Sequence, residues 1–508
     1  MSARAARQPL LVALAAILLG AAALAASFVF AGEQQIDRRS ADAPVNAGAR
    51  DPGDISANNS PSMAQNPKNP DELAVANRVD SPDYTCVLNT SRDHGRNWSP
   101  VRVRIAPGEG RKCYAPDVAY ASDGTLHMSY VTLRGSGNVP AKAWVARSTD
   151  GGRTLSAPVS VSGALAFQVR LVADPDRPKR LYLTWLQADD VGLLRFSGSD
   201  QRVQVSRSDD GGRTWGAPAR VSAPGRERPL APSAAIGPDG ELYVLYLDVG
   251  GDRLDYEAAH EGFGGEPYDG RFTLVLGRSD DGGATWQESV VSKEIVPTRR
   301  FIAFLPPTPA LAVDRSDGTI YAAFEDGATR PADVHVWSLP EGASAWEGPV
   351  RVNDTPRGDR TWQYLPRIAV APGGRVDVVY YDRRFDPKGV LTDVAVQSSA
   401  DGAKTFAPRV TLSARSFDSR IGSGSERDMP DLGNRFGLVS ERDVALAVWS
   451  DTRAGSVASN KQDIAFAQAA VGTAGGLSQG VQAALRVAGA ILLLGGIALL
   501  VALRLRRT

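Results

Sequence analysis

The chain has 508 residues, in which 57 Lys and Arg balance 57 Asp and Glu, and it contains four His and two Cys. A chain of this length exceeds a typical single domain, so it holds either several domains or one array of repeats. Formal neutrality argues against a nucleic acid as partner. So few His residues argue against a His-rich metal site.

The first segment, residues 1–31, has the pattern of a signal peptide or a signal anchor. Arg4 and Arg7 precede an uncharged, mostly apolar run from Pro9 to Ala31. Small residues in the run offer cleavage sites, while its length also suits an anchor that is retained. The next segment, residues 32–60, is polar and rich in small residues, which predicts a linker. We expect a ring-closing strand somewhere in residues 40–60.

From residue 61 to residue 470 the sequence repeats with a period of about 60, which indicates a repeat array or a propeller. Each repeat has four predicted strands, separated by turns that carry Asp, Gly or Pro. Seven second strands can be counted, and they begin at Asp71, Thr125, Arg180, Glu241, Thr319, Arg375 and Asp443. The last repeat ends after its third strand, as in a ring that an N-terminal strand completes. We therefore predict an all-β protein with a seven-bladed β-propeller, and six blades are the alternative.

A turn with the pattern Ser-x-Asp-x-Gly-x-Thr-Trp recurs between the third and fourth strands. Its Asp and Ser oxygens are expected to accept backbone N–H groups, its Gly to take a positive φ, and its aromatic ring to pack onto the blade. Such a turn stabilises the fold and has no reactive geometry. The Asp residues of the five copies are Asp93, Asp150, Asp210, Asp281 and Asp401.

With these motifs the chain resembles the Asp-box (BNR-repeat) proteins of the sialidase-like superfamily over most of the repeat region. The resemblance implies a propeller whose Asp boxes lie away from the ligand-binding face. For the sialidases it implies a Tyr nucleophile assisted by a Glu, an Asp acid/base, and three Arg that hold a carboxylate. The family's Phe/Tyr-Arg-Ile-Pro motif is missing. The nearest string, Tyr364-Leu-Pro-Arg367-Ile368, has another order and lies in the sixth repeat.

The candidate site is expected on the face opposite the Asp-box turns. Two sets of loops lie on that face: those that enter the first strand of each blade and those that join the second strand to the third. The candidate catalytic residues are Tyr364, Glu257 and Asp255, the last two within an insertion from Val249 to Gly270. The candidate substrate-binding residues, which suit a carboxylate, are Arg228, Arg300, Arg367 and Arg384. Salt bridges between blades are the alternative use of such charges. The pairs Asp382/Arg383 and Asp451/Arg453 share a repeat position that favours this alternative.

The two cysteines, Cys86 and Cys113, fall in neighbouring repeats. In an exported protein they are candidates for a disulfide that clamps adjacent sheets, and two buried thiols are the alternative. No metal site and no cofactor are predicted. Calcium among the acidic loops is the alternative, although no EF-hand-like spacing is present.

Residues 471–485 read as a Gly-rich linker, and residues 486–508 as a transmembrane helix with a basic cytoplasmic tail. The uncharged run from Val487 to Leu503 is closed by Arg504, Arg506 and Arg507, as the positive-inside rule favours. A buried core helix is the alternative. The prediction is a cell-membrane protein with a single C-terminal transmembrane helix and its propeller on the extracytoplasmic side.

Together these features predict a tethered propeller that binds or processes a glycan or another anionic ligand at a central funnel. If the protein is catalytic, the resemblance implies a glycoside hydrolase similar to an exo-α-sialidase. The alternative is a non-catalytic propeller that binds a protein or acts as an envelope assembly scaffold.

Overall fold

The computed structural model describes residues 8–29, 34–38, 41–51, 53–136, 138–189, 201–226, 228–252, 268–298, 308–328, 332–422, 432–473 and 479–505. The chain divides into two units. One unit comprises Met1–Asp37 and Val471–Thr508, and the other comprises Arg38–Ala470.

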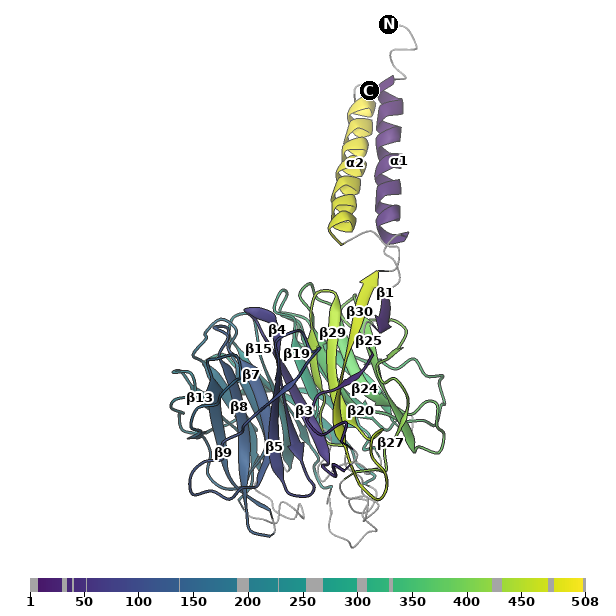
Figure 1. Cartoon of the computed structure of the whole chain (residues 1–508). Coiled ribbons are helices and arrows are strands. Elements are labelled where there is room, and N and C mark those ends of the chain that lie inside the picture. The colour runs from purple at the N-terminus through teal and green to yellow at the C-terminus, as the bar shows by residue number, and fades with distance from the viewer. Residues whose placement is uncertain are drawn as a thin grey trace. The chain divides into compact units, whose positions relative to one another are not determined.

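The larger unit is a seven-bladed β-propeller (Figure 1), as the repeats predict. Six blades are antiparallel sheets whose strands follow chain order. Blade 1 comprises β3 (Asn58–Asn66), β4 (Asn69–Val79), β5 (Thr85–Ser91) and β6 (Ser99–Val101), and blade 2 comprises β7 (Cys113–Tyr120), β8 (Leu126–Arg134), β9 (Val139–Ser148) and β10 (Val159–Ser160). Blade 3 comprises β11 (Ala166–Ala173), β12 (Leu181–Gln187), β13 (Arg202–Ser208) and β14 (Ala219–Arg220), and blade 4 comprises β15 (Pro229–Ile236), β16 (Leu242–Asp248), β17 (Phe272–Ser279) and β18 (Gln287–Ile295).

The next two blades have the same order of strands, and blade 6 carries a short additional strand that pairs with its third strand. Blade 5 comprises β19 (Ala310–Val313), β20 (Ile320–Asp326), β21 (Asp333–Leu339) and β22 (Glu347–Arg351). Blade 6 comprises β23 (Gln363–Val370), β24 (Val376–Asp382), β25 (Leu391–Ser399), β26 (Val410–Thr411) and β27 (Phe417–Asp418).

Blade 7 joins the two ends of the repeat region. Its strands β28 (Gly437–Ser440), β29 (Val444–Asp451) and β30 (Asp463–Thr473) come from the last repeat, and β1 (Gln34–Arg38) and β2 (Ala43–Pro44) come from the N-terminal segment. In β2, Ala43 lies opposite Phe466 of β30. Of these two N-terminal strands, β2 lies within residues 40–60, where the closing strand was expected, and β1 lies before that range. The first strand of blade 1, β3, begins at Asn58, slightly before the predicted start of the propeller.

A buried lysine reinforces this closure. The Lys461 Nζ donates hydrogen bonds to three backbone carbonyl groups of residues 48–51, at 2.9 to 3.1 Å, and lies 3.7 Å from Asp463. Asn46 bonds to the same strand, since Ile464 N donates to its side-chain oxygen at 2.7 Å. The N-terminal segment is therefore held by specific polar contacts as well as by strand pairing.

The hydrophobic core lies between the blades. The second strands, such as β12 and β16, are buried along nearly their whole length because neighbouring blades cover both faces of each sheet. Strands buried on both faces have continuous apolar sequences instead of alternating ones. This is why runs such as LYVLYL recur at the same place in each repeat.

The recurring turns have the predicted hydrogen bonds. In the second copy, Gly152 N donates to Ser148 Oγ at 2.9 Å, and Thr154 donates to Asp150 through its backbone N–H and its hydroxyl. The Ser148 and Thr154 hydroxyls lower the pKa of Asp150. The same Ser–Asp hydrogen bonding occurs in the copies that contain Asp93, Asp210, Asp281 and Asp401.

The large apolar residue of each turn packs between two blades. Trp215 of blade 3 joins a core formed by blades 2 and 3, and Trp286 of blade 4 joins a core formed by blades 3 and 4. Trp98 of blade 1 contacts Phe466 of blade 7, with ring centroids 5.6 Å apart. The turns therefore contribute to adhesion between blades as well as to local structure.

The smaller unit contains two helices, α1 (Gln8–Val29) and α2 (Gln479–Leu505). Among the described residues, one helical stretch, Ala484–Leu505, is long and apolar enough to cross a membrane by length and composition. A shorter apolar stretch, Val12–Leu24, lies in α1.

We predict that Ala403→Gly stabilises the protein. Ala403 has a φ of 64° at the turn position where other copies have Gly, such as Gly212 with a φ of 78°. A non-Gly residue in this region costs about 1 kcal/mol, so the substitution should raise the free energy of unfolding by nearly that amount. Denaturant titration of the full chain measures the change. The reciprocal substitution, Gly212→Ala, should destabilise the protein, and equal effects of the two would contradict the prediction.

Candidate functional site

The innermost strands of the blades form a closed ring, in which β3, β7, β11, β15, β19, β23 and β28 contact one another in turn and β28 contacts β3. Five of these strands share a bulge near their start. In each one a non-Gly residue with a φ between 51° and 58° precedes the point where the strand pairing resumes. The residues at which pairing resumes are Ser62, Asp117, Arg170, Ser233 and Arg367.

Charged side chains from blades 2, 3, 6 and 7 meet inside this ring. Arg170 interacts electrostatically with Arg435, Asp117 and Arg367, and Asp117 is also a neighbour of Arg367 and Arg435. The Arg435 Nη1 lies 3.8 Å from the Asp117 Oδ1. Because blades 2 and 6 are not adjacent in the ring, the interaction between Asp117 and Arg367 places both side chains toward the axis. We call these four residues the axial arginine cluster.

The charged side chains of the axial arginine cluster differ in their hydrogen-bond partners. The Asp117 carboxylate accepts hydrogen bonds from Ser62 Oγ and, at 2.9 Å, from Leu171 N. Arg170 Nη2 donates to Thr308 Oγ1 of blade 5 at 2.9 Å. The Arg367 side chain is only partly buried, and its Nε has no hydrogen-bond partner among the described residues.

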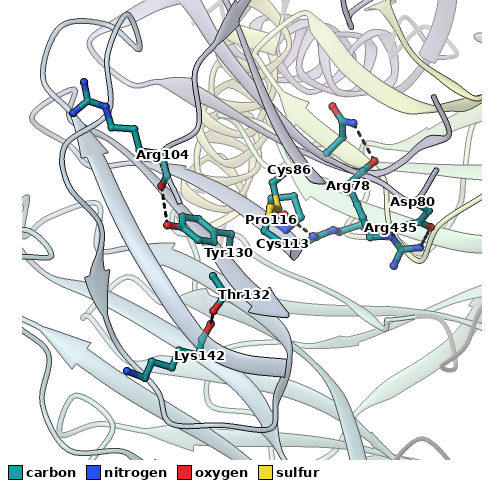
Figure 2. Close-up of a disulfide and its surroundings, with 11 residues drawn as sticks. Arg78, Asp80, Cys86, Arg104, Cys113, Pro116, Tyr130, Thr132, Lys142 and Arg435 are labelled. Carbon is teal, nitrogen blue, oxygen red and sulfur yellow. Dashed lines mark hydrogen bonds and ion pairs between the residues drawn. A yellow bond between two sulfur atoms is a disulfide. The ribbon is translucent and has the colours of Figure 1, made fainter. Parts of the chain in front are cut away.

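Arg435 is held by backbone groups of two other blades. Its Nε donates to the Ser60 carbonyl at 3.1 Å, and its Nη2 donates to the Pro116 carbonyl. Figure 2 shows this second contact beside the disulfide between Cys86 and Cys113. The disulfide joins β5 of blade 1 to β7 of blade 2, so it fixes the strand that carries Asp117.

The axial arginine cluster has an excess of positive charge. Burial, followed by the neighbouring charge of Arg435, lowers the pKa of Arg170 to about 9, so this guanidinium is still positive at neutral pH. Burial also lowers the pKa of Arg367 and of Arg435. Among the described residues, three guanidinium groups thus share the Asp117 carboxylate, and such a site stabilises a bound anion more than a neutral molecule. Guanidinium groups are well suited to carboxylates and sulfates because they donate paired hydrogen bonds.

A buried carboxyl group lies next to the bulge that precedes Arg367. Glu325, at the end of β20, accepts a hydrogen bond from Leu365 N at 2.6 Å and another from Thr298 Oγ1 at 2.8 Å. Burial raises the pKa of Glu325 to about 7. The side chain thus fixes the backbone two residues before Arg367, and it changes charge near neutral pH.

Tyr364, the candidate nucleophile, is almost fully buried. Its hydroxyl lies 3.5 Å from Thr392 Oγ1 of β25, and its ring packs against Tyr381, with the centroids 5.3 Å apart. The Arg383 guanidinium lies over the same ring at 5.0 Å. Tyr364 is therefore a packed residue of blade 6 in this structure, three residues before the arginine of the axial cluster.

The structure brings one of the four candidate substrate-binding arginines, Arg367, into the axial cluster. Arg384 lies between two carboxylates, at 2.6 Å from both Asp354 and Asp382. Asp382 therefore pairs with Arg384 and also, at 3.3 Å, with Arg409. Arg228 donates to the Asp252 carbonyl beside blade 4. The remaining candidates, Arg300, Glu257 and Asp255, lie outside the described residues.

The pair Asp451 and Arg453 forms as expected from the repeat. Their side chains are 2.5 Å apart, and Arg453 also pairs with Asp42 of the N-terminal segment. The equivalent position in blade 6 is the pair Asp382 and Arg384. These charges therefore tie together segments at the blade ends, as the alternative of structural salt bridges proposed.

Sequence reasoning missed Arg170 and Asp117. A usable signal was present in the repeat, because the central residue of the bulge is Pro in Ser60-Pro-Ser62, Ala115-Pro-Asp117 and Leu365-Pro-Arg367. The residue after this Pro is the one that faces the axis. Arg170 follows Val instead of Pro, so alignment of its whole strand would have been needed to find it.

The axial cluster has the donor groups of an anion site. It has one carboxylate and no His, so it lacks the ligand set of a metal centre. A search of the described residues for three or more His, Cys, Asp or Glu side chains grouped for a metal ion finds none.

Comparison with known proteins gives likenesses of structure only, because no family model and no curated protein sequence matches the chain. A protein of unknown function from Dyadobacter fermentans is similar at a TM-score of 0.48 and 16% identity, over 86% of this chain and 99% of its own. An α-L-arabinanase from Penicillium chrysogenum, complexed with arabinobiose, is similar at a TM-score of 0.44 and 17% identity, over 65% of this chain and 92% of its own.

A Hadza microbial sialidase is similar at a TM-score of 0.42 and 16% identity, over 79% of this chain and 73% of its own. Likenesses at this level concern the type of fold, and function has to be argued from the site itself.

We predict that Glu325 makes stability depend on pH between about 4.5 and 7. In this range the unfolded chain releases the proton of Glu325 while the folded protein keeps it, because burial raises the folded pKa to about 7. The stability that protonated Glu325 adds to the folded protein is therefore fully present at acid pH and is lost as pH rises through 7. In Glu325→Gln the amide can still accept from Leu365 N.

Denaturant titrations of the full chain at several pH values test this. Relative to wild type, Glu325→Gln should gain stability as pH rises from 5 to 8, by on the order of 1–3 kcal/mol. Glu347→Gln, at an exposed position on β22 of the same blade, serves as the control and should keep the wild-type profile. Parallel profiles for wild type and Glu325→Gln would refute the assignment.

Proposed function

We propose that the propeller binds an anionic glycan, one that carries a carboxylate or a sulfate, at the axial arginine cluster. The observation that supports this proposal is the imbalance of charge at the axis, where three guanidinium groups share Asp117. A bound anion would offset the mutual repulsion of these cations. The apo protein would pay for that repulsion in stability, so the arrangement is best explained by a ligand.

Arg367 is the proposed anion contact. Arg170 is engaged with Thr308, and Arg435 is engaged with two backbone carbonyls. Arg367 as a residue is partly exposed, and its Nε, which is buried, has no hydrogen-bond partner in the described part of the chain. In this proposal Arg367 forms the direct hydrogen bonds to the ligand, while Arg170 and Arg435 supply fixed positive charge behind it.

The proposed location is the extracytoplasmic side of a cell membrane, with α2 as the anchor. The Ala484–Leu505 stretch of α2 has the length and composition of a membrane span, and the sequence continues into a basic tail. Basic residues after a membrane span favour the cytoplasmic side, which leaves the propeller outside.

We propose binding in preference to hydrolysis. The buried hydroxyl of Tyr364 would first have to become accessible before it could attack a sugar. The sialidase-like reaction with Tyr364, Glu257 and Asp255 as catalytic residues is thus the narrower proposal. Turnover of a fluorogenic sialoside by the full-length protein, lost in Tyr364→Phe, would replace the binding proposal with this one.

We predict that Arg367→Met weakens binding of carboxylated sugars by about tenfold or more, because a charge-assisted hydrogen bond contributes about 1.5–3 kcal/mol. Calorimetric titration of the full-length protein in detergent with glucuronate and N-acetylneuraminate measures the affinity. Arg367→Lys, which keeps the charge and loses the planar donor pair, should show an intermediate loss.

Two controls separate binding from folding. Arg153→Ala removes an exposed arginine from a recurring turn and should leave the affinity unchanged. Arg367→Met should keep or raise the melting temperature, since it removes a cation from a positively charged cluster. Equal affinity for glucose and glucuronate, or wild-type affinity in Arg367→Met, would disprove the proposed site.

A further inference from the structure

The two helices of the smaller unit pack against each other through glycines. A Cβ atom added at Gly20 of α1 would lie 2.7 Å from the backbone nitrogen of Leu493 in α2. One added at Gly489 would lie 3.0 Å from the Gly20 carbonyl oxygen, and one added at Gly496 would lie 3.0 Å from the Ala13 carbonyl oxygen. The two backbones are thus in direct contact, at a separation that any larger side chain would prevent.

The contacts define an antiparallel pair. Residues near the start of α1 meet the later part of α2, as Ala13 meets Gly496, and residues further along α1 meet earlier ones, as Leu24 meets Gly489. Figure 1 shows the two helices side by side. The first turn of α1 and the last turn of α2 therefore lie at the same end of the pair.

The contact faces have matching spacing. In α1 the less exposed positions include residues 13, 17, 20 and 24, and in α2 they include residues 489, 493, 496 and 500. In both sets successive positions are four, three and four residues apart. This is the spacing of the contact positions in two supercoiled helices. Small residues on such a seam are the usual way in which helices associate in lipid, where burial of apolar surface gives no driving force.

The opposite faces of both helices carry exposed apolar side chains. Leu18 and Leu19 of α1 are 69% and 62% exposed, and Ile491 and Leu494 of α2 are 65% and 67% exposed. This is the reverse of a soluble helix pair, which would bury its large apolar residues and expose polar ones. Lipid is the environment that such a surface fits.

The length of α1 also suits a membrane span. Its 22 residues contain no Asp, Glu, Lys or Arg, and at 1.5 Å per residue they extend about 33 Å, close to the thickness of a bilayer core. In the sequence, Arg4 and Arg7 precede α1, and Arg504 lies in the last turn of α2. Since the start of α1 and the end of α2 lie together, the positive-inside rule assigns both flanks to the cytoplasm.

We propose that α1 is retained in the mature protein and forms, with α2, a two-helix membrane anchor held by the glycine seam of Gly20, Gly489 and Gly496. Both ends of the chain then lie in the cytoplasm, and the propeller is attached to the membrane at both of its ends. The inference rests on the proposed role of α2 as a membrane anchor, and it is independent of the ligand at the axis.

The first test asks whether α1 is retained. The full chain carries one epitope tag at each end, and membranes are washed with carbonate, which releases proteins that no helix anchors. Both tags are expected on one membrane-bound chain of full mass. Loss of the N-terminal tag from the anchored protein would overturn the proposal, whereas release of the whole chain by carbonate would overturn the anchoring by α2.

The second test asks whether the two helices meet at the seam. In Ile17→Cys/Leu493→Cys both cysteines replace larger side chains of the seam, where Ile17 faces Gly496 and Leu493 faces Gly20, so no atom is added at a glycine and an oxidant can join the two thiols. The control pair, Leu18→Cys/Leu494→Cys, lies one residue away on the exposed faces. A protease site placed between α1 and the propeller lets a non-reducing gel show whether the two fragments stay linked.

The seam pair is expected to cross-link at least several-fold more than the control pair. Gly496→Leu should reduce this cross-link, because its side chain would collide with the Ala13 carbonyl and with the backbone nitrogen of residue 17. Gly495→Leu makes the same change in composition at a position with no atom of the other helix within 4 Å, and it should have no effect. Equal cross-linking of the two pairs, or equal effects of the two leucine variants, would refute the seam.

Discussion

The closure of the ring by the N-terminal segment is the interaction on which the rest of the propeller depends. The β2 strand pairs with β30, and Lys461 holds the carbonyl groups of residues 48–51. A buried ammonium group costs a large desolvation energy unless its three hydrogens find acceptors, and here each one does. Closure brings blade 7 against blade 1, and only then does Arg435 reach the Ser60 and Pro116 carbonyls.

The axial arginine cluster follows from this closure. Its members come from blades that are far apart in the sequence, and each is placed by a bulge or a loop at the start of an inner strand. The scaffold holds together charges that repel one another, which is tolerable because the apolar contacts between seven blades are extensive. Rigid placement of this kind keeps the guanidinium groups from moving apart. The positive electrostatic potential at the axis therefore persists without a ligand. Such preorganised charge is what favours an anion at this position.

The recurring turns and the axial cluster have different chemistry. The recurring turns carry Asp residues whose oxygens are saturated by their own Ser, Thr and backbone partners, so these carboxylates serve the fold. In the axial cluster, within the part of the chain that the structure describes, the Asp117 carboxylate is shared by three arginines. The many acidic residues in the repeats thus indicate little about ligands, whereas the few residues after the bulges are informative.

Much of the fold could be predicted from the sequence because its determinants are local. The Ser-x-Asp turns, the apolar second strands and the missing fourth strand of the last repeat each act within a few residues. They favoured a seven-bladed ring with an N-terminal closing strand, with six blades as the alternative. The candidate site was less accessible. Arg367 was predicted among the binding residues, while Arg170 and Asp117 were not, since a single arginine or aspartate on an apolar strand has no distinctive neighbours in the sequence.

Burial was the other property that sequence could not supply. Tyr364 looked like a loop residue near an arginine, yet the register of β23 turns it into the packing of blade 6, against Tyr381. Glu325 has no distinctive neighbours in the sequence, yet its buried carboxyl group accepts a hydrogen bond from Leu365 N in the bulge before Arg367. In the same way, apolar composition predicted the helix at each end of the chain, but the glycine seam between them was visible only in the structure.

The sequence by itself determined the repeat, the chemistry of the turns and the apolar character of both terminal segments, and it favoured seven blades over six, because these depend on composition and spacing along the chain. The tertiary structure alone decided which charges meet at the axis, which tyrosine is buried and which faces of the two helices touch. Those properties depend on how the bulges orient side chains and on which distant segments become neighbours once the ring is closed.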